Sequence, residues 1–342
     1  MSWKNVIGRV SFSNCDPIFD GLNPEWTILS APPAWLTGHV MRRDCIAAPI
    51  PSADYASNNE DLMLLPEIGI VSNGNVGSVL LFGNRPIENM RDIALPTDSS
   101  TSKVLLNWIV KNRGLDPKFV ESGPDINSML EKCDGALLIG DRAILASISN
   151  PELVRMDLGE EWTRVTGLPM VFGVFVARRD SPRDVLLKAH SQMISQIETF
   201  NNDRKWRKKV ISRTSKKMGF PEDRVEEYFE TEVRNKMSEE DIQGLMRFLK
   251  DGCGMESDPV WLDIHSEESS LLLATQSNRS NATSHDSATT ISLSSLNLSR
   301  TPNAVLSPMA PNASAASCLT MTSSSKSSSL SIKNGTAEES CI

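Results

Sequence analysis

Seven short apolar runs, separated by segments with helical periodicity, limit most strongly what this chain can fold into. Runs of this length are typical of buried strands, and the amphipathic segments between them are typical of helices that cover a sheet. The alternation predicts an α/β fold. The runs lie at residues 7–12, 45–50, 68–71, 79–82, 93–95, 136–139 and 171–177.

Helix start and stop signals support this pattern. A hydroxyl-rich start at Ser99 to Thr101 precedes an apolar face that ends near Gly114. We expect Ser181 to cap a second helix that has Pro182 in its first turn, and Ser238 to cap the last one. The basic stretch at 204–217 has two interpretations, a phosphate-binding patch or a solvated helix face, and the acidic helix predicted after it favours the second.

The composition changes abruptly near the C-terminus. Residues 266–342 are rich in serine, threonine and asparagine, and no aromatic residue follows Trp261. Such a segment cannot bury enough apolar surface to offset its ordering entropy, so we predict a disordered tail.

Charge and composition also restrict the classes of partner that this chain is expected to bind. The net charge of −8 does not favour a nucleic-acid or membrane-binding surface, and the N-terminus has no secretory signal pattern, so we expect a cytoplasmic protein. Six cysteines and four histidines are scattered without metal-ligand spacing, which predicts no metal site and reduced thiols. The sequence leaves the oligomeric state open.

Six ordered segments carry a family resemblance. They are residues 12–22, 44–56, 65–82, 98–102, 138–143 and 157–172, and their order and spacing resemble the chorismate dehydratase family of the futalosine route to menaquinone. The resemblance covers most of residues 5–252.

The resemblance implies a type II periplasmic-binding-protein-like fold with two α/β lobes, a hinge and a ligand cleft. Lobe 1 would be discontinuous, formed by residues 1–84 and 178–255, and residues 85–177 would form the inserted lobe 2. Ligands of open α/β sheets bind at strand ends and helix N-termini, which such a cleft brings together.

Two residues match the family's catalytic positions. Asn14 matches its active-site asparagine, although the local sequence Asn-Cys-Asp-Pro alone favours an Asx-turn. Ser78 follows Gly77, where the backbone can approach a ligand closely, and its alternative role is that of a strand-start serine.

Substrate-binding candidates come from helix starts and strand ends. Ser100, Thr101 and Ser102 open a helix whose free N–H groups and hydroxyls suit a carboxylate, and we expect two of the three to touch ligand. Gly140 and Asp141 follow a strand; Asp141 suits a general base, but repulsion from an anionic substrate favours helix capping or a hinge salt bridge. Thr166 and Gly167 precede the strand that returns to lobe 1.

The implied reaction is the dehydration of chorismate to 3-(1-carboxyvinyloxy)benzoate, a hydro-lyase activity without a cofactor. Because the matched positions offer no histidine, lysine or cysteine base, we expect the substrate's own enolpyruvyl carboxylate to assist proton removal. A non-catalytic solute-binding protein of the same fold is the alternative. The sister enzyme of the pathway relies on a histidine in the inserted lobe, and no histidine lies between His39 and His190.

Overall fold

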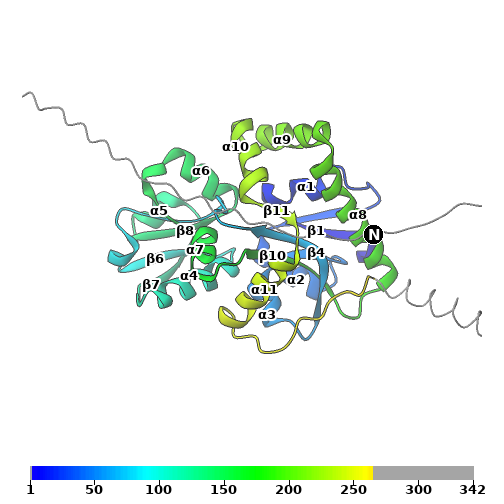
Figure 1. The fold of residues 1–342 in the computed structure, drawn as a ribbon, viewed down its shortest axis with the longest axis horizontal. Coiled ribbons are helices and arrows are strands. Elements are labelled where there is room, and N and C mark those ends of the chain that lie inside the picture. The colour runs from blue at the N-terminus through cyan, green and yellow to red at the C-terminus, as the bar shows by residue number, and fades with distance from the viewer. Residues whose placement is uncertain (1, 265–342) are drawn as a thin grey trace, which may run out of the picture. The chain divides into compact units, whose positions relative to one another are not determined.

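The computed structural model describes residues 2–264, all of which belong to one compact unit, Met1–Asn278 (Figure 1). The predicted disordered tail, residues 266–342, lies outside the described residues. Within residues 2–264, no helix combines the length and the apolar character that a bilayer crossing needs.

A four-stranded antiparallel sheet with the order β11-β4-β10-β3 forms one half of this unit. A parallel pair, β1 and β2, adjoins it, because the Gly8 N–H donates to the Ala47 carbonyl beside β3 at 2.8 Å. The bounds are β1 Val6–Val10, β2 Thr27–Ala31, β3 Ala48–Pro51, β4 Leu62–Ser72, β10 Met170–Arg178 and β11 Arg234–Lys236.

A five-stranded mixed sheet with the order β7-β6-β8-β5-β9 forms the other half. β6 is parallel to β7 and β8, whereas β5 runs antiparallel to β8 and β9. The bounds are β5 Val79–Gly83, β6 Asp92–Pro96, β7 Lys118–Ser122, β8 Gly135–Ile139 and β9 Val154–Asp157.

Strand pairing corrects the expected lobe boundaries at both crossings. The sequence assigned residues 79–84 to lobe 1, yet β5 pairs with β8 and β9 in the five-stranded sheet. It assigned residues 170–177 to lobe 2, yet β10 pairs with β3 and β4. Hydrogen bonds to neighbouring strands, which no local pattern reports, decide where each strand belongs.

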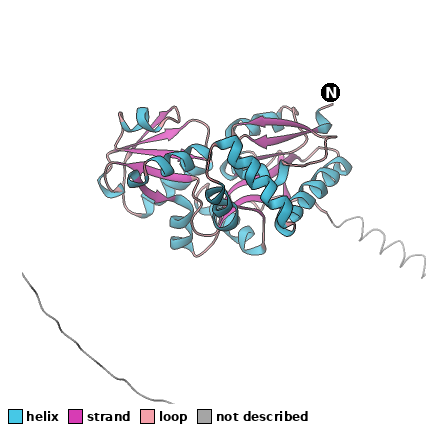
Figure 2. Cartoon of the chain, turned by 90° about the horizontal axis from the view of Figure 1, so that it is seen from above, coloured by secondary structure: helices cyan, strands magenta, loops and turns pink. Residues whose placement is uncertain are grey.

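Helices flank both sheets, as Figures 1 and 2 show. α4 to α7 accompany the five-stranded sheet, and α1 to α3 and α8 to α11 accompany the other strands (Figure 1). The bounds are α1 Asp16–Phe19, α2 Pro33–Met41, α3 Ser52–Ser57, α4 Thr101–Asn112, α5 Ile126–Leu130, α6 Asp141–Ser149, α7 Leu158–Thr166, α8 Arg183–Asn202, α9 Arg204–Met218, α10 Glu222–Glu227 and α11 Glu239–Asp251. Two shorter turns matter below, the 3-10 turn η2 (Ser13–Cys15) and the π-helical turn η5 (Tyr228–Glu232).

The predicted capping signals are partly confirmed. Ser238 forms a capping box with Asp241 at the start of α11. Ser181 does not cap α8, because Pro182 is the residue at the cap position and the Ser181 hydroxyl is buried without a hydrogen-bond partner among the described residues. The basic stretch forms α9, which buries Val210 and Ile211 and leaves most of its charged side chains exposed.

Each of the seven apolar runs forms or contains part of a strand. The strands that the sequence did not predict are β2, β7, β9 and β11, and all four lie at the edges of their sheets. An edge strand is covered less than an inner one, so it needs no continuous apolar run.

Candidate active site

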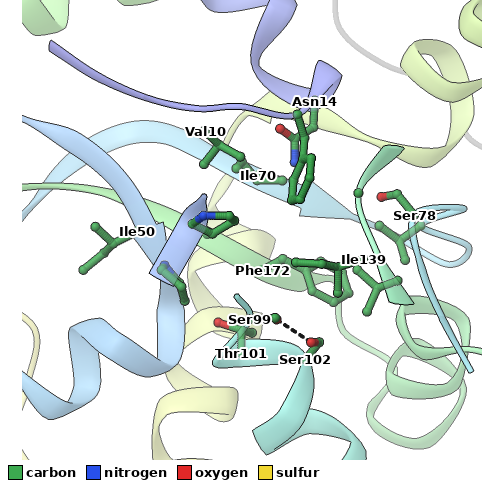
Figure 3. A pocket seen from close by; sticks show the side chains of 17 residues that line it. Val10, Asn14, Ile50, Ile70, Ser78, Ser99, Thr101, Ser102, Ile139 and Phe172 are labelled. Carbon is green, nitrogen blue, oxygen red and sulfur yellow. Dashed lines mark hydrogen bonds between the residues drawn. The ribbon is translucent and has the colours of Figure 1, made fainter. Parts of the chain in front are cut away.

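A pocket of about 550 Å³, counting the space open to solvent, is lined by residues from both sheets and from the starts of two helices (Figure 3). This volume lies within the range of small-molecule sites. Its lining is mostly apolar and includes Val10, Ile50, Ile70, Ile139 and Phe172. Polar groups approach from two sides, Asn14 and Ser78 from one and Ser99, Thr101 and Ser102 from the other. Gly140, which is hydrogen-bonded to Ser78, and Phe12, whose ring lies against Gly140, belong to the first side. We name the first side the Asn14 wall and the second the α4 wall.

Asn14 lies in η2, directly after β1, and its side chain lines the pocket. The residue is 9% exposed, and its Oδ1 has no hydrogen-bond partner among the described residues. A buried amide oxygen without a partner costs free energy unless a ligand or water satisfies it. The Asn14 Oδ1 is therefore an acceptor that no described group of the protein satisfies.

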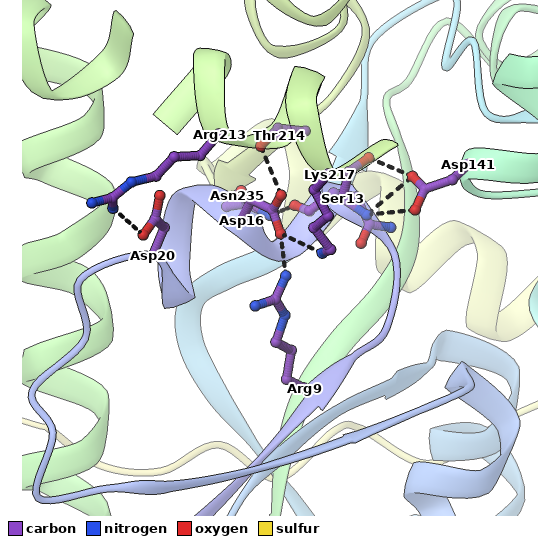
Figure 4. A network of polar contacts seen from close by, with 10 residues as sticks. Arg9, Ser13, Asp16, Asp20, Asp141, Arg213, Thr214, Lys217 and Asn235 are labelled. Carbon is purple, nitrogen blue, oxygen red and sulfur yellow. Dashed lines mark hydrogen bonds and ion pairs between the residues drawn. The ribbon is translucent and has the colours of Figure 1, made fainter. Parts of the chain in front are cut away.

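Three sets of contacts hold the Asn14 backbone from behind (Figure 4). The Asp141 carboxylate accepts hydrogen bonds from the Ser13 N–H at 3.0 Å and from the Ser13 hydroxyl. The Asn235 amide donates to the Asn14 carbonyl at 3.2 Å and to the Gly69 carbonyl at 3.1 Å.

The third set is centred on Asp16, which is buried at the start of α1. Its carboxylate pairs with Arg9 and accepts a hydrogen bond from the Thr214 hydroxyl at 2.7 Å, and Lys217 lies at 3.5 Å (Figure 4). The turn that carries Asn14 is therefore fixed by charged groups outside the pocket.

Ser78 directly precedes β5 and also lines the pocket. The Asp157 carboxylate accepts hydrogen bonds from the N–H groups of Val76 and Gly77 at 3.0 and 2.8 Å, which fixes the preceding turn. The Ser78 carbonyl accepts from the Gly140 N–H at 2.7 Å, and the Tyr228 hydroxyl donates to Ser78 Oγ at 3.0 Å. Sequence reasoning missed Tyr228 and Asp157, because neither is near Ser78 in the chain.

The α4 wall differs from the expected helix cap. Ser100 occupies the cap position without a side-chain hydrogen bond, and it does not line the pocket. Ser99 lines it instead, and its hydroxyl contacts that of Ser102. Thr101 Oγ1 accepts a hydrogen bond from the Ala53 N–H at 3.2 Å. The first-turn N–H groups of α4 have no carbonyl partner within the helix, so this wall presents neutral donors.

Gly140 lines the pocket, whereas Asp141 does not. Gly140 has a φ of 62°, and an added Cβ would collide with the Phe12 ring, so a glycine is needed on both grounds. Asp141 faces Ser13 instead of the cavity, and its burial raises the pKa of its carboxyl. Asp141 is thus absent from the lining of this pocket, and its hydrogen bonds join the start of α6 to the turn after β1.

Thr166 and Gly167 are the other residues that the structure places away from the pocket lining. The Thr166 hydroxyl donates to the Trp162 carbonyl at 2.8 Å. Gly167 ends α7 with a left-handed φ of 72°. Both residues terminate a helix, which is a structural task.

None of the residues that line this pocket carries an ionisable side chain. Cys15, next to Asn14, is buried, and desolvation raises the pKa of its thiol to about 12, so it is no thiolate at neutral pH. Within residues 2–264, no group of three or more His, Cys, Asp or Glu side chains is placed to hold a metal ion.

Comparison with known proteins identifies the family of this chain. The family model described as "Menaquinone biosynthesis" matches residues 6–252. The chain belongs to the menaquinone biosynthesis family. A chorismate dehydratase from Thermus thermophilus is 31% identical over 193 residues, which is 52% of this chain and 71% of the relative.

Solved structures show that this family member has a periplasmic-binding-protein-like fold. A Candida albicans protein described as having that generic fold matches with a TM-score of 0.54 at 12% identity, covering 74% of this chain and 91% of the other. The alkanesulfonate-binding protein SsuA from Xanthomonas axonopodis matches with a TM-score of 0.53 at 13% identity, covering 75% and 95%. A protein from Archaeoglobus fulgidus matches with a TM-score of 0.57 at 19% identity, covering 73% of this chain and 97% of the other.

Proposed function

We propose that this protein is a chorismate dehydratase, which converts chorismate to 3-(1-carboxyvinyloxy)benzoate and water. The observation that carries the proposal is a pocket whose polar groups are all neutral and whose buried Asn14 Oδ1 has no protein partner among the described residues. The dehydratase relative from Thermus thermophilus supports the choice of substrate.

The two walls suit the two ends of such a substrate. Chorismate carries two carboxylates, and the free N–H groups and hydroxyls of the α4 wall would bind one of them without a counter-charge. Asn14 and Ser78 would then face the reacting part of the ring. Neutral donors avoid the desolvation cost that a buried cation would add.

The reaction requires the loss of a ring proton and of the neighbouring hydroxyl. The electrons of the broken C–H bond form the third double bond of the aromatic ring as the C–O bond breaks. The proton lost from the ring balances the departing hydroxide, and together they make up the water that is released. Since the lining offers no ionisable side chain, the enolpyruvyl carboxylate of the substrate accepts the ring proton in this proposal. The protein orients the substrate: the Asn14 Oδ1 accepts a hydrogen bond from it, and the Asn14 Nδ2 and the Ser78 hydroxyl donate where charge develops.

The direct test is incubation of the purified protein with chorismate, followed by chromatography of the products. We expect loss of chorismate and formation of the aromatic product in equal amounts. Asn14→Ala removes the unsatisfied amide and should reduce the rate strongly while the melting temperature is retained. Spontaneous decay of chorismate in buffer gives the baseline.

A chain that binds chorismate in calorimetry but never converts it would contradict the dehydratase and favour a solute-binding role. Failure to bind chorismate at all would contradict both.

A further inference from the structure

Tyr228 lies behind Ser78 without lining the pocket. It is 2% exposed and begins the π-helical turn η5, in which the Val233 N–H donates to the Tyr228 carbonyl at 2.9 Å. The Tyr228 ring packs against Phe229 with 5.5 Å between the ring centroids. The Arg224 guanidinium lies 5.9 Å from the centroid of the Tyr228 ring. π-helical turns are rare and often occur at functional sites.

The Tyr228 hydroxyl is held in its neutral, donating form. Burial raises the pKa of the phenol well above its ordinary value. The hydrogen bond with Ser78 and nearby Arg224 lower the pKa, whereas Asp141 and Glu232 raise it further. The single proton of a neutral phenol is donated to Ser78 Oγ at 3.0 Å. A serine hydroxyl that accepts a hydrogen bond keeps its own proton free to donate elsewhere.

The hydroxyl hydrogen of Ser78 can be donated to a group in the pocket. Among the described residues, Ser78 Oγ has no second hydrogen-bond partner, and in Figure 3 its hydroxyl is directed toward the side on which Asn14 lies. The Ser78 backbone is already fixed by Gly140 and by the Asp157-bound turn, so the phenol is not needed to hold the strand. What the phenol adds is the direction of the serine O–H bond.

We propose that Tyr228 is a positioning residue that makes Ser78 a hydrogen-bond donor to the leaving hydroxyl of the substrate. This inference rests on the proposed dehydration. A hydroxide is a poor leaving group, so a donor that is aimed at it acts mainly in the transition state. Loss of the phenol oxygen should then reduce kcat and affect KM little.

The chain supplies its own matched control, because it contains two tyrosines and both are buried. Tyr55 Oη accepts a hydrogen bond from the Val260 N–H at 3.1 Å, and Tyr55 does not line the pocket. Tyr228→Phe and Tyr55→Phe therefore remove the same atom from two buried rings.

The experiment measures kcat, KM and melting temperature for wild type, both Phe variants, Ser78→Ala and the double variant Tyr228→Phe with Ser78→Ala. We expect Tyr228→Phe to lower kcat about tenfold to thirtyfold, with KM changed less than about twofold. In the Ser78→Ala background, Tyr228→Phe should lower kcat less than about twofold, because Tyr228 acts on the substrate only through Ser78. Tyr55→Phe should lower the melting temperature and leave kcat unchanged.

Three results would overturn the inference. They are an unchanged kcat in Tyr228→Phe, losses that multiply fully in the double variant, and a Tyr228→Phe chain that no longer folds, which would make the phenol a structural group. A wild-type protein that does not consume chorismate would instead overturn the proposed function, and this assignment with it.

Discussion

The two walls of the pocket are built differently. Behind the Asn14 wall, carboxylates hold the backbone: buried Asp141 binds Ser13, buried Asp16 fixes the start of α1, and half-buried Asp157 fixes the turn before Ser78. In the α4 wall, neutral hydroxyls contact one another or a backbone N–H, as Ser99 and Ser102 do with each other and Thr101 does with Ala53.

Under the proposed function, this difference gives the two walls different tasks: the Asn14 wall orients the substrate, and the α4 wall binds its carboxylate. The charges behind the Asn14 wall face the protein, so they fix geometry without repelling a substrate that is itself negative. The α4 wall needs no such support, because a helix start presents its donors in a fixed arrangement. The proposed function makes both walls sensitive to a new negative charge, and four experiments test how far they differ.

The largest effect is expected from Asn14→Asp, which places an acid in the wall that faces the reacting ring. A carboxylate beside a dianionic substrate, with no cation in the lining, should lower kcat/KM by about a thousandfold or more. Asn14→Ala is the neutral control and should lower kcat/KM less than Asn14→Asp does. The defect of Asn14→Asp should shrink as the pH is lowered, because a buried carboxyl takes up a proton. Activity within tenfold of wild type at neutral pH would contradict the placement of the substrate.

Thr101→Asp puts the same charge in the α4 wall and should lower kcat/KM by about a hundredfold. The fold should persist, because an aspartate can still accept the hydrogen bond from the Ala53 N–H. Thr101→Asn introduces a side chain of nearly the same shape as aspartate but without the charge, and it should lower kcat/KM only a few-fold. Equal kinetics for the Asp and Asn variants, with both folded, would show that no anion binds at this wall.

Asp157→Ala tests the support behind Ser78 through stability. The carboxylate accepts hydrogen bonds from the N–H groups of Val76, Gly77, Gly159 and Glu160. Removing it should lower the free energy of unfolding by about 2 kcal/mol or more, measured by urea denaturation. Asp125→Ala, which removes the exposed cap of α5, should cost less. Equal losses would mean that Asp157 is an ordinary helix cap.

The smallest effect concerns the pH dependence that Asp141 contributes. Burial and nearby Asp16 raise the pKa of this carboxyl, while Ser13 and Lys217 act against the rise. A raised pKa means that the folded state binds the proton more tightly, so this contribution to stability is present below the ordinary carboxyl pKa of about 4 and is lost as the pH rises through the raised value.

The unfolding free energy of wild type relative to Asp141→Asn should therefore fall as the pH is raised from acidic to neutral. Denaturation of both proteins across that range measures it. A difference that grows with pH would show that the hydrogen bonds from Ser13 outweigh the desolvation.

Local patterns in the sequence predicted the α/β class, seven of the eleven strands among the described residues, the approximate starts of α4, α8 and α11, and the family. These features depend on local periodicity, capping and ordered segments. The sequence also placed Asn14, Ser78 and Gly140 among the candidates, and the structure brings all three to one side of a pocket. The four missed strands lie at sheet edges, where partial exposure removes the apolar signal.

The pairing of the strands and the side chains that support the site followed from the packing of distant segments. Ser13 and Asp141 are 128 positions apart, and Ser78 and Tyr228 are 150 apart. At the α4 wall, Ser99 lines the pocket and Ser100 does not. Such contacts form when separate segments pack together, and a buried hydrogen bond between distant residues leaves no periodic trace in the chain.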